Sequence, residues 1–339
     1  MGTNGSPTLR KQNKMNTTNN NQTTNKETTM NTIMKTSTSF INRDLPCGIG
    51  RITNKHEALE LAGLNYRVDS VPLSTLTTGK YADKFYAAVR STDGAMLGVN
   101  SSRFHHFQPS LLGDFAEAIT KIRPDAHISL GGQSPDERTQ FLGVCLDGEP
   151  VKSVGGDTRY RHLLMYNGTN GNRVFGGHAV TQEMRCMNMF RALLKGGSQI
   201  FSLNHNFSAQ HLIPFAMAAV QNAVNLYDQM DIEIERLLSI QVQQPVQVLG
   251  MLAGQRPSKD GRGLTEWEKR FDSLCEEYKA DYNSNLRGTA WGIVMAAEGT
   301  DEHRSKVAKG KRDTQRITRM LTGNYPLTMS AMDMFASAQ

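Results

Sequence analysis

Two hydrophobic patterns divide the chain, an alternating one in its middle and a helical one towards its C-terminus. Apolar residues alternate with polar ones, or form short apolar runs between turn residues, and so predict strands at 66–73, 85–90, 96–99, 127–130, 139–146, 159–166 and 173–180. Asp93-Gly94 and the Asn/Gly-rich segment 167–171 are typical hairpin turns, because Asn and Gly tolerate positive φ angles. The last four strands are therefore expected to form an antiparallel meander.

Helical spacing predicts most of the remaining elements. Apolar residues recur at intervals of three and four in 55–64, 108–122, 181–195, 213–240 and 286–298, and 246–252 fits a short helix or a strand. The basic segment 304–319 is also expected to be helical. Another helix is expected to begin at Thr265, where Glu268 completes a capping box. The helix at 181–195 is expected to close the meander.

These elements predict an α+β fold, an antiparallel β-meander packed on helices with a helical C-terminal part. Residues 1–39 are rich in Asn and Thr and nearly free of aromatic residues, so they are expected to form a disordered tail. The α+β core is placed at 40–200, the helical region at 201–323 and a Met-rich C-terminal tail at 324–339.

Composition narrows the functional classes. The 339 residues carry a net charge of +6, which is compatible with a polyanionic partner. The four cysteines are scattered without a CxxC pair, which argues against a zinc ribbon and favours a reducing cytoplasm. Because apolar runs fall short of the roughly 20 residues that span a bilayer, no membrane association is expected.

Basic residues gather in the predicted meander and the helix after it. Arg159 and Arg161 are two residues apart, so both face one side of a strand and could follow the phosphates of a single strand, with Tyr166 or Phe175 as a stacking face. The alternative is that these cations are solvated or paired with Asp157 and Glu183. The candidate nucleic-acid-binding residues here are Arg138, Lys152, Arg159, Arg161, Arg173, Arg185, Arg191 and Lys195.

A second basic cluster lies near the C-terminus. At helical spacing, Lys309, Arg312, Arg316 and Arg319 share one face, and only Asp313 offers a nearby acidic partner. This face is a second candidate for contact with nucleic acid, and a solvated helix surface is the alternative.

Catalytic and metal-binding motifs are weak. The pair His205 and His211 does not match the usual spacing of zinc ligands, so no metal site or cofactor is expected. A phosphate-binding P-loop is missing, which argues against ATP hydrolysis. His178, Cys186 and Asn188 offer the one Cys/His arrangement for an enzyme of unassigned chemistry, although a free Cys is usually a small core residue.

Several segments together resemble a known family. Leu97-Gly98-Val99-Asn100 leads to Phe107-Gln108-Pro109 and a helix, Arg185-Cys186-x-Asn188 follows the meander, and the segment 288–292 (GTAWG) precedes an apolar helix. This order is similar to the phage- and plasmid-encoded family called domain of unknown function 932, over roughly 61–321, and the similarity implies a mobile-element origin. Met189 departs from the family pattern, which has Thr there.

The architecture suggests a more specific role. A basic chain with a β-meander packed on a helix also resembles the single-strand annealing recombinases of phages, an analogy of fold alone. We therefore expect a non-enzymatic, oligomeric, cytoplasmic protein that binds single-stranded DNA during recombination or replication. The alternatives are the enzyme above and a structural or host-takeover protein that acts through protein contacts.

Overall fold

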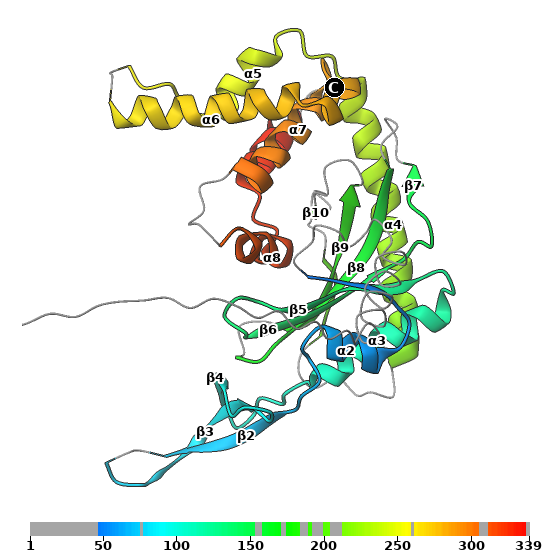
Figure 1. Cartoon of the computed structure of the whole chain (residues 1–339), viewed down its shortest axis with the longest axis vertical. Coiled ribbons are helices and arrows are strands. Elements are labelled where there is room, and N and C mark those ends of the chain that lie inside the picture. Colours follow the sequence, from blue (N-terminus) through cyan, green and yellow to red (C-terminus); the bar gives the residue numbers. More distant parts are fainter. Residues whose placement is uncertain are drawn as a thin grey trace, which may run out of the picture. The chain divides into compact units, whose positions relative to one another are not determined.

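The computed structural model describes residues 47–74, 77–152, 158–170, 174–183, 189–191, 199–203, 212–258, 261–304 and 311–336. The chain separates into two units, Met1–Thr38 and Ser39–Gln339, and every described residue belongs to the second. Antiparallel strands dominate its first half and helices its second (Figure 1), which confirms the predicted α+β class. The tail expected at 1–39 lies outside the described residues.

The larger sheet contains the predicted meander. Its strands follow the order β1-β5-β6-β8-β9-β10, with β7 paired to β8 and β11 paired to β9. The β8–β9 hairpin runs from Arg159 opposite Glu183 to Tyr166 opposite Gly176, as the Asn/Gly-rich turn predicted. The bounds are β1 (Gly48–Ile52), β5 (His127–Gln133), β6 (Thr139–Cys145), β7 (Val151–Lys152), β8 (Thr158–Gly168), β9 (Phe175–Glu183), β10 (Met189–Arg191) and β11 (Gln199–Leu203).

The prediction of a helix at 181–195 is wrong. The structure describes two parts of this segment, 181–183 and 189–191, and both are strands. Strand β9 continues to Glu183, and β10 pairs with it so that Phe190 lies opposite Thr181. The apolar spacing in this segment fits a helix, but the ladder with β8 supplies hydrogen-bond partners that hold β-branched Val180 and Thr181 extended. Residues 184–188 and 192–195 lie outside the described part of the chain.

A smaller antiparallel sheet has the order β2-β3-β4. It comprises β2 (Val68–Ser74), β3 (Tyr81–Arg90) and β4 (Met96–Ser101), with the predicted Asp93-Gly94 turn between the last two. Gly94 has a φ of 73°, the positive value that this turn requires.

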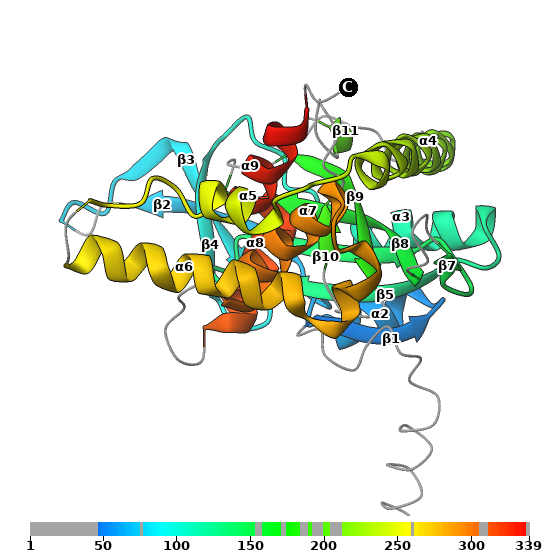
Figure 2. The same ribbon diagram turned by 90° about the horizontal axis from the view of Figure 1, so that it is seen from above.

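The helices largely follow the predicted pattern. Their bounds are α2 (Lys55–Leu61), α3 (Pro109–Ile122), α4 (Leu212–Ser239), α5 (Pro245–Leu252), α6 (Arg262–Lys279), α7 (Ala290–Gly299), α8 (Arg312–Thr322) and α9 (Pro326–Phe335), with a 3-10 turn η4 (Asp281–Leu286) and a π-helical turn η5 (Thr300–Arg304). Asn54 caps α2 by accepting from the backbone of His56 and Glu57. Figure 2 shows α5 and α7 alongside α6, where Leu249, Leu274 and Ile293 belong to one core.

Several helices differ from expectation: α7 begins at Ala290 and not at Leu286, and α8 spans Arg312–Thr322 where a helix over 304–319 was expected. Helix α6 begins at Arg262 after Gly261, and Thr265 already lies in its first turn, where its hydroxyl bonds the Gly261 carbonyl. The expected capping box is therefore wrong. The Met-rich segment near the C-terminus forms α9, which buries Ala331 and Phe335.

Strand β8 contributes side chains to two cores because its residues alternate between the two faces of the sheet. Leu163 and Met165 belong to the core shared with α3 and α4, whereas Leu164 and Tyr166 pack with residues of α8. Tyr227 of α4 binds the backbone of this hairpin, with its hydroxyl 2.6 Å from the His162 carbonyl oxygen. Helices thus cover both faces of the larger sheet (Figure 1).

Candidate nucleic-acid interface

The three-stranded sheet carries a row of apolar side chains that is open to solvent. Val71 lies opposite Ala87, and Ala87 lies opposite Val99, so all three side chains point to one face. Phe85 is two residues before Ala87 and points to the same face. Val71 is 43%, Phe85 51% and Val99 46% exposed, whereas the small side chain of Ala87 between them is 5% exposed, so the three larger side chains of this face are open to solvent.

The other face of this sheet is attached to the larger sheet. Asn100 Nδ2 donates to the carbonyl oxygen of Thr169 at 2.7 Å. Gly98 approaches the same β8–β9 turn so closely that a Cβ atom on it would lie 2.6 Å from the Cβ of Asn170. These contacts require a residue without a side chain at Gly98, and they direct the apolar row away from the larger sheet.

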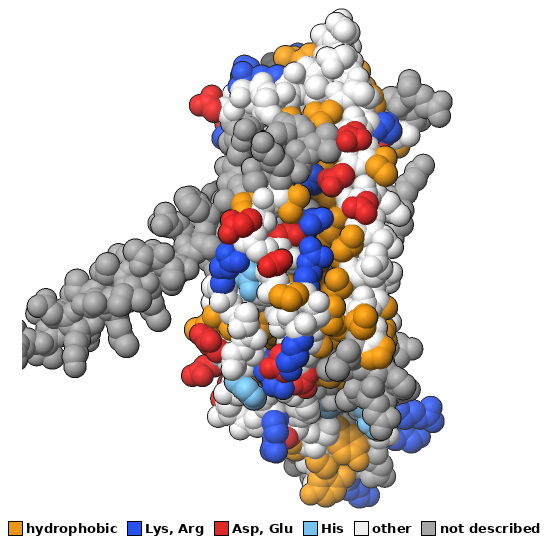
Figure 3. Space-filling model, turned by 90° about the vertical axis from the view of Figure 1, so that its right-hand side faces the viewer, with side chains coloured by type: hydrophobic (Ala, Val, Ile, Leu, Met, Phe, Trp, Pro, Cys, Tyr) orange, Lys and Arg blue, Asp and Glu red, His pale blue; other side chains and the backbone are white. Residues whose placement is uncertain are grey.

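Cations and an exposed tyrosine accompany the apolar row. Lys80, Lys84 and Arg103 are exposed, and in the described part of the chain they form no ion pair. Tyr81 beside Lys80 is 69% exposed. Figure 3 shows hydrophobic side chains bordered by Lys and Arg at the lower end of the molecule, where Figure 1 places this sheet.

We refer to these residues together as the β2–β4 surface. They are Val71, Lys80, Tyr81, Lys84, Phe85, Val99 and Arg103. Lys84 precedes Phe85 in a strand and therefore faces the opposite side of β3, but both side chains are exposed. The surface thus combines two aromatic rings with three cations, which are the components that bind bases and phosphates of a single strand.

Among the predicted site residues whose side chains the structure describes, Arg138 alone is exposed and lies near this surface. Its backbone carbonyl accepts hydrogen bonds from the amide (2.9 Å) and the hydroxyl (3.0 Å) of Thr169. Thr169 in turn binds Asn100 of β4. Arg138 therefore lies at the junction of the two sheets.

The predicted row of Arg159 and Arg161 faces α4 and not solvent. Arg159 is 4% exposed, and its guanidinium lies 2.7 Å from Asp231 of α4. Arg161 pairs with the buried Asp147 at 2.7 Å and lies over the ring of Tyr227. These partners differ from the Asp157 and Glu183 considered from the sequence, and they leave neither guanidinium free for a phosphate.

The predicted basic face of α8 also points inward. Arg316 Nε lies 3.3 Å from Glu302 of the π-helical turn, and Arg319 is 8% exposed. Burial raises the pKa of the Glu302 carboxyl, and the charge of Arg316 opposes that rise. This acidic partner comes from another element, so the spacing of residues along α8 does not reveal it.

The other predicted cations are described in part or not at all. For Lys152, Arg191 and Arg312 the structure describes the backbone alone, in β7, β10 and α8. Arg173, Arg185, Lys195 and Lys309 lie outside the described residues, and so do Cys186 and Asn188 of the enzyme alternative.

His178 is buried, and so are Tyr166 and Phe175, the two aromatic residues that the sequence offered for stacking on bases. Tyr166 stacks on His178 with ring centroids 5.0 Å apart, and His178 is 4% exposed. Phe175 lies in the core between Phe107 and Phe115. Neither Tyr166 nor Phe175 can therefore stack on a base. Among the described residues, His, Cys, Asp and Glu form no group of three that could hold a metal ion.

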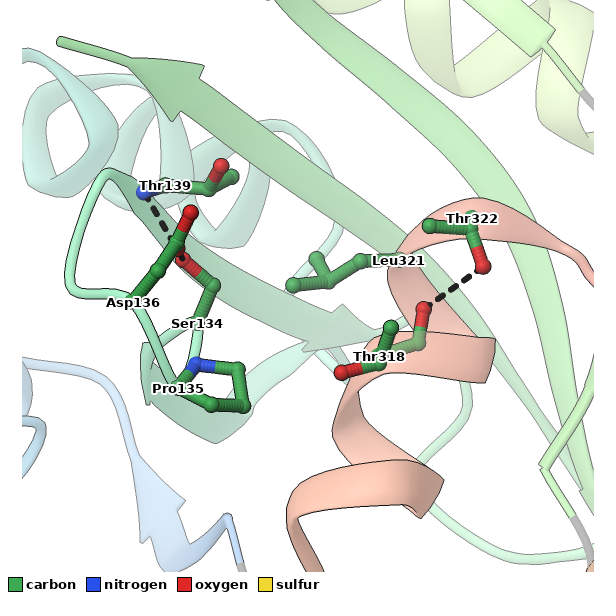
Figure 4. A pocket seen from close by; sticks show the side chains of 7 residues that line it. All are labelled: Ser134, Pro135, Asp136, Thr139, Thr318, Leu321 and Thr322. Carbon is green, nitrogen blue, oxygen red and sulfur yellow. Dashed lines mark hydrogen bonds between the residues drawn. The ribbon is translucent and has the colours of Figure 1, made fainter. Parts of the chain in front are cut away.

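A small pocket lies between the β5–β6 turn and α8 (Figure 4). Its volume is about 230 Å³, below the roughly 300 Å³ at which pockets for small ligands begin. The Ser134 hydroxyl bonds Asp136 at 2.5 Å, and the Thr322 hydroxyl bonds the Thr318 carbonyl at 2.8 Å. These polar groups satisfy one another, so the pocket is a structural feature.

The sequence contains one signal for the β2–β4 surface. Lys80-Tyr81 and Lys84-Phe85 repeat a cation followed by an aromatic residue where β3 begins. Alternation alone predicted a buried apolar face for these strands, and only the tertiary structure shows that the face is exposed.

Comparison with known proteins places the chain in a family. No curated protein and no solved structure matches it. No helix in the described ranges is long and apolar enough to cross a membrane. The family model described as "Domain of unknown function (DUF932)" matches residues 96–321, more than half of the chain, and the chain therefore belongs to this family.

Proposed function

We propose that the chain binds single-stranded DNA through the β2–β4 surface. The observation that carries this proposal is the exposed Phe85 beside Lys84, which forms no ion pair with the described residues, together with Lys80 and Tyr81 four residues earlier, where β3 begins. Aromatic rings stack on bases without regard to sequence, and each stacked base contributes roughly 1–3 kcal/mol. Lysines follow the phosphates, which makes the affinity dependent on salt.

Single-stranded DNA fits this surface better than a duplex does. An aromatic side chain can stack only on a base whose face is accessible, as in an unpaired strand. We further propose that several copies assemble on one strand and anneal it to a complementary strand, in the recombination or replication of a phage or other mobile element within the host cytoplasm. The basis for this role is the analogy of fold with single-strand annealing recombinases that the sequence suggests.

The test is fluorescence anisotropy with a labelled oligo-dT over a series of salt concentrations. The double variant Lys80→Glu/Lys84→Glu should bind more weakly, and the slope of log affinity against log salt should fall by about 0.7 for each lost phosphate contact. The control is Lys311→Glu, a charge reversal of the same kind at one exposed position just before α8. This variant should bind like the wild type.

A matched pair tests the stacking component. Phe85→Ala should weaken binding about tenfold, whereas Met251→Ala, which removes a side chain 57% exposed on α5, should not. Binding that neither Phe85→Ala nor the double variant weakens would refute this surface. An affinity independent of salt would refute nucleic-acid binding and favour the alternative, docking of a protein on the apolar row.

A further inference from the structure

A second pocket, built from other elements, lies between α6, the π-helical turn η5 and the start of α9. Its volume is about 710 Å³, within the range of roughly 300–1,000 Å³ that is typical of small-molecule sites. Helix α6 supplies Lys269, Asp272 and Ser273, η5 supplies Thr300, and α8 supplies Arg319. The volume and the mixed polar lining make this pocket suited to a small polar ligand.

Arg319 lines this pocket and carries a buried hydrogen-bond donor. The residue is 8% exposed, and Nη1 has no hydrogen-bond partner among the described residues. Leaving a buried donor of a charged group unpaired destabilises a protein. A ligand that carries an acceptor oxygen would remove this penalty.

The nearest acidic groups already have other partners. Asp301 Oδ2 accepts from the Leu327 and Thr328 amides, both at 3.0 Å, and from the Thr328 hydroxyl at 2.9 Å. Glu302 accepts from the Tyr325 hydroxyl at 3.0 Å. The charges of these carboxylates lie near Arg319 and help to stabilise it in the interior, but they do not supply the missing partner of Nη1.

The part of α6 that lines the pocket carries two cations, Lys269 and Arg270, and three anions, Glu266, Asp272 and Glu276. Lys269 and Asp272 are both exposed and line the pocket. Arg304, also in the lining, is already paired with Glu276 and Glu277. Lys269 can therefore approach a bound anion, whereas Asp272 would repel it.

We propose that this pocket binds a small molecule bearing a phosphate or carboxylate group, whose oxygen accepts from Arg319 Nη1 and whose charge is further stabilised by Lys269. The same oxygen chemistry occurs in the phosphates of nucleic acids, so the test uses both sources. Inorganic phosphate is titrated into the full chain at constant ionic strength, with the arginine Nε–Hε resonances as the readout. An oligonucleotide is then added as a competitor.

The expected result is one saturable site that the oligonucleotide does not displace. Lys269→Ala should weaken phosphate binding by about fivefold, and Asp272→Asn should strengthen it by up to about fivefold, because the two variants remove charges of opposite sign. Both positions are exposed on a helix, so both variants should fold. Arg319→Lys keeps the charge but removes Nη1, and it should abolish saturable binding.

Three results would overturn the proposal. Resonance shifts that rise linearly with phosphate would mean that no site exists. Changes of the same sign in Lys269→Ala and Asp272→Asn would place any binding elsewhere. Displacement of phosphate by the oligonucleotide would assign the pocket to nucleic acid and not to a small molecule.

Discussion

Arg161 of the interior strand β8 and Asp147, just after β6, form a two-pronged ion pair. Arg161 Nη2 lies 2.7 Å from Oδ1 and Nε lies 3.1 Å from Oδ2, while the backbone amide of Arg161 donates to Oδ2 at 3.0 Å. Asp147 is 5% exposed and also lies 3.6 Å from Arg123. This geometry assigns Arg161 to the stability of the sheet and not to a ligand.

Asp147→Asn should therefore destabilise the protein strongly. The substitution leaves the largely buried Arg161 guanidinium without its counter-charge, and breaking such a pair typically lowers the free energy of unfolding by about 3 kcal/mol. Urea unfolding followed by circular dichroism measures this loss. The control is Asp114→Asn, at a partly exposed pair with Lys55, where the loss should be at most about 1 kcal/mol. Equal losses in the two variants would contradict the structural role of Arg161.

Arg316→Gln should affect stability and leave DNA binding unchanged. It removes the ion-pair partner of Glu302, a residue 3% exposed, and should lower the free energy of unfolding by about 2–3 kcal/mol. The salt dependence of oligonucleotide binding, measured where the variant is folded, should match that of the wild type. A smaller slope with unchanged stability would instead place the DNA site on α8.

Gly98→Ala should disturb the attachment of the smaller sheet. Its Cβ would lie 2.6 Å from Asn170 Cβ and 2.9 Å from Asn170 Cα, so the turn must move, and we expect a loss of about 2 kcal/mol. Gly250→Ala in α5 is the matched control, because the nearest atom to its Cβ is 3.8 Å away. The free energy of unfolding of this control should rise by up to about 1 kcal/mol, because Ala has a higher helix propensity than Gly. Thermal unfolding distinguishes the two, and a stabilised Gly98→Ala would contradict the close approach.

Stability should fall in acid because of two buried histidines. Burial lowers the pKa of His162 and of His127 to about 4, and the charge of His127 adds to the shift at His162. In the unfolded chain both titrate near 6.5, so the unfolded chain binds more protons between these two values. The free energy of unfolding should therefore be greatest above pH 6.5 and fall by about 3 kcal/mol per histidine as the pH drops to 4.

Urea unfolding at several pH values checks this dependence. His162→Gln removes one of the two titrations, so its stability should fall less steeply than that of the wild type between pH 6.5 and 4. Parallel curves for the two proteins would show that His162 does not cause the acid sensitivity.

The sequence predicted local features of the fold because their causes are local. The β8–β9 hairpin follows from alternation and its Asn/Gly turn, and the start of α3 follows from Pro109 at its first turn. The error at 181–195 arose because its apolar spacing also fits a helix, while the β8 and β10 partners that keep the described residues extended are tertiary.

The candidate site was harder to predict because it depends on contacts between distant residues. Arg159 and Asp231 are 72 residues apart, and Arg316 and Glu302 come from different elements, so their pairing could not be derived from spacing. Similarly, the pattern of Val71, Phe85 and Val99 predicts an apolar face, but only the packing shows that this face is uncovered.

The most direct test of the central claim is photo-crosslinking of the full chain to an oligonucleotide that carries 5-iododeoxyuridine, with the crosslinked residues identified by mass spectrometry. Stacking on the β2–β4 surface predicts crosslinks at Tyr81 or Phe85, and Phe85→Ala should remove those at position 85 while Met251→Ala leaves them intact. Crosslinks confined to α8, or none under conditions where the oligonucleotide is bound, would contradict the claim.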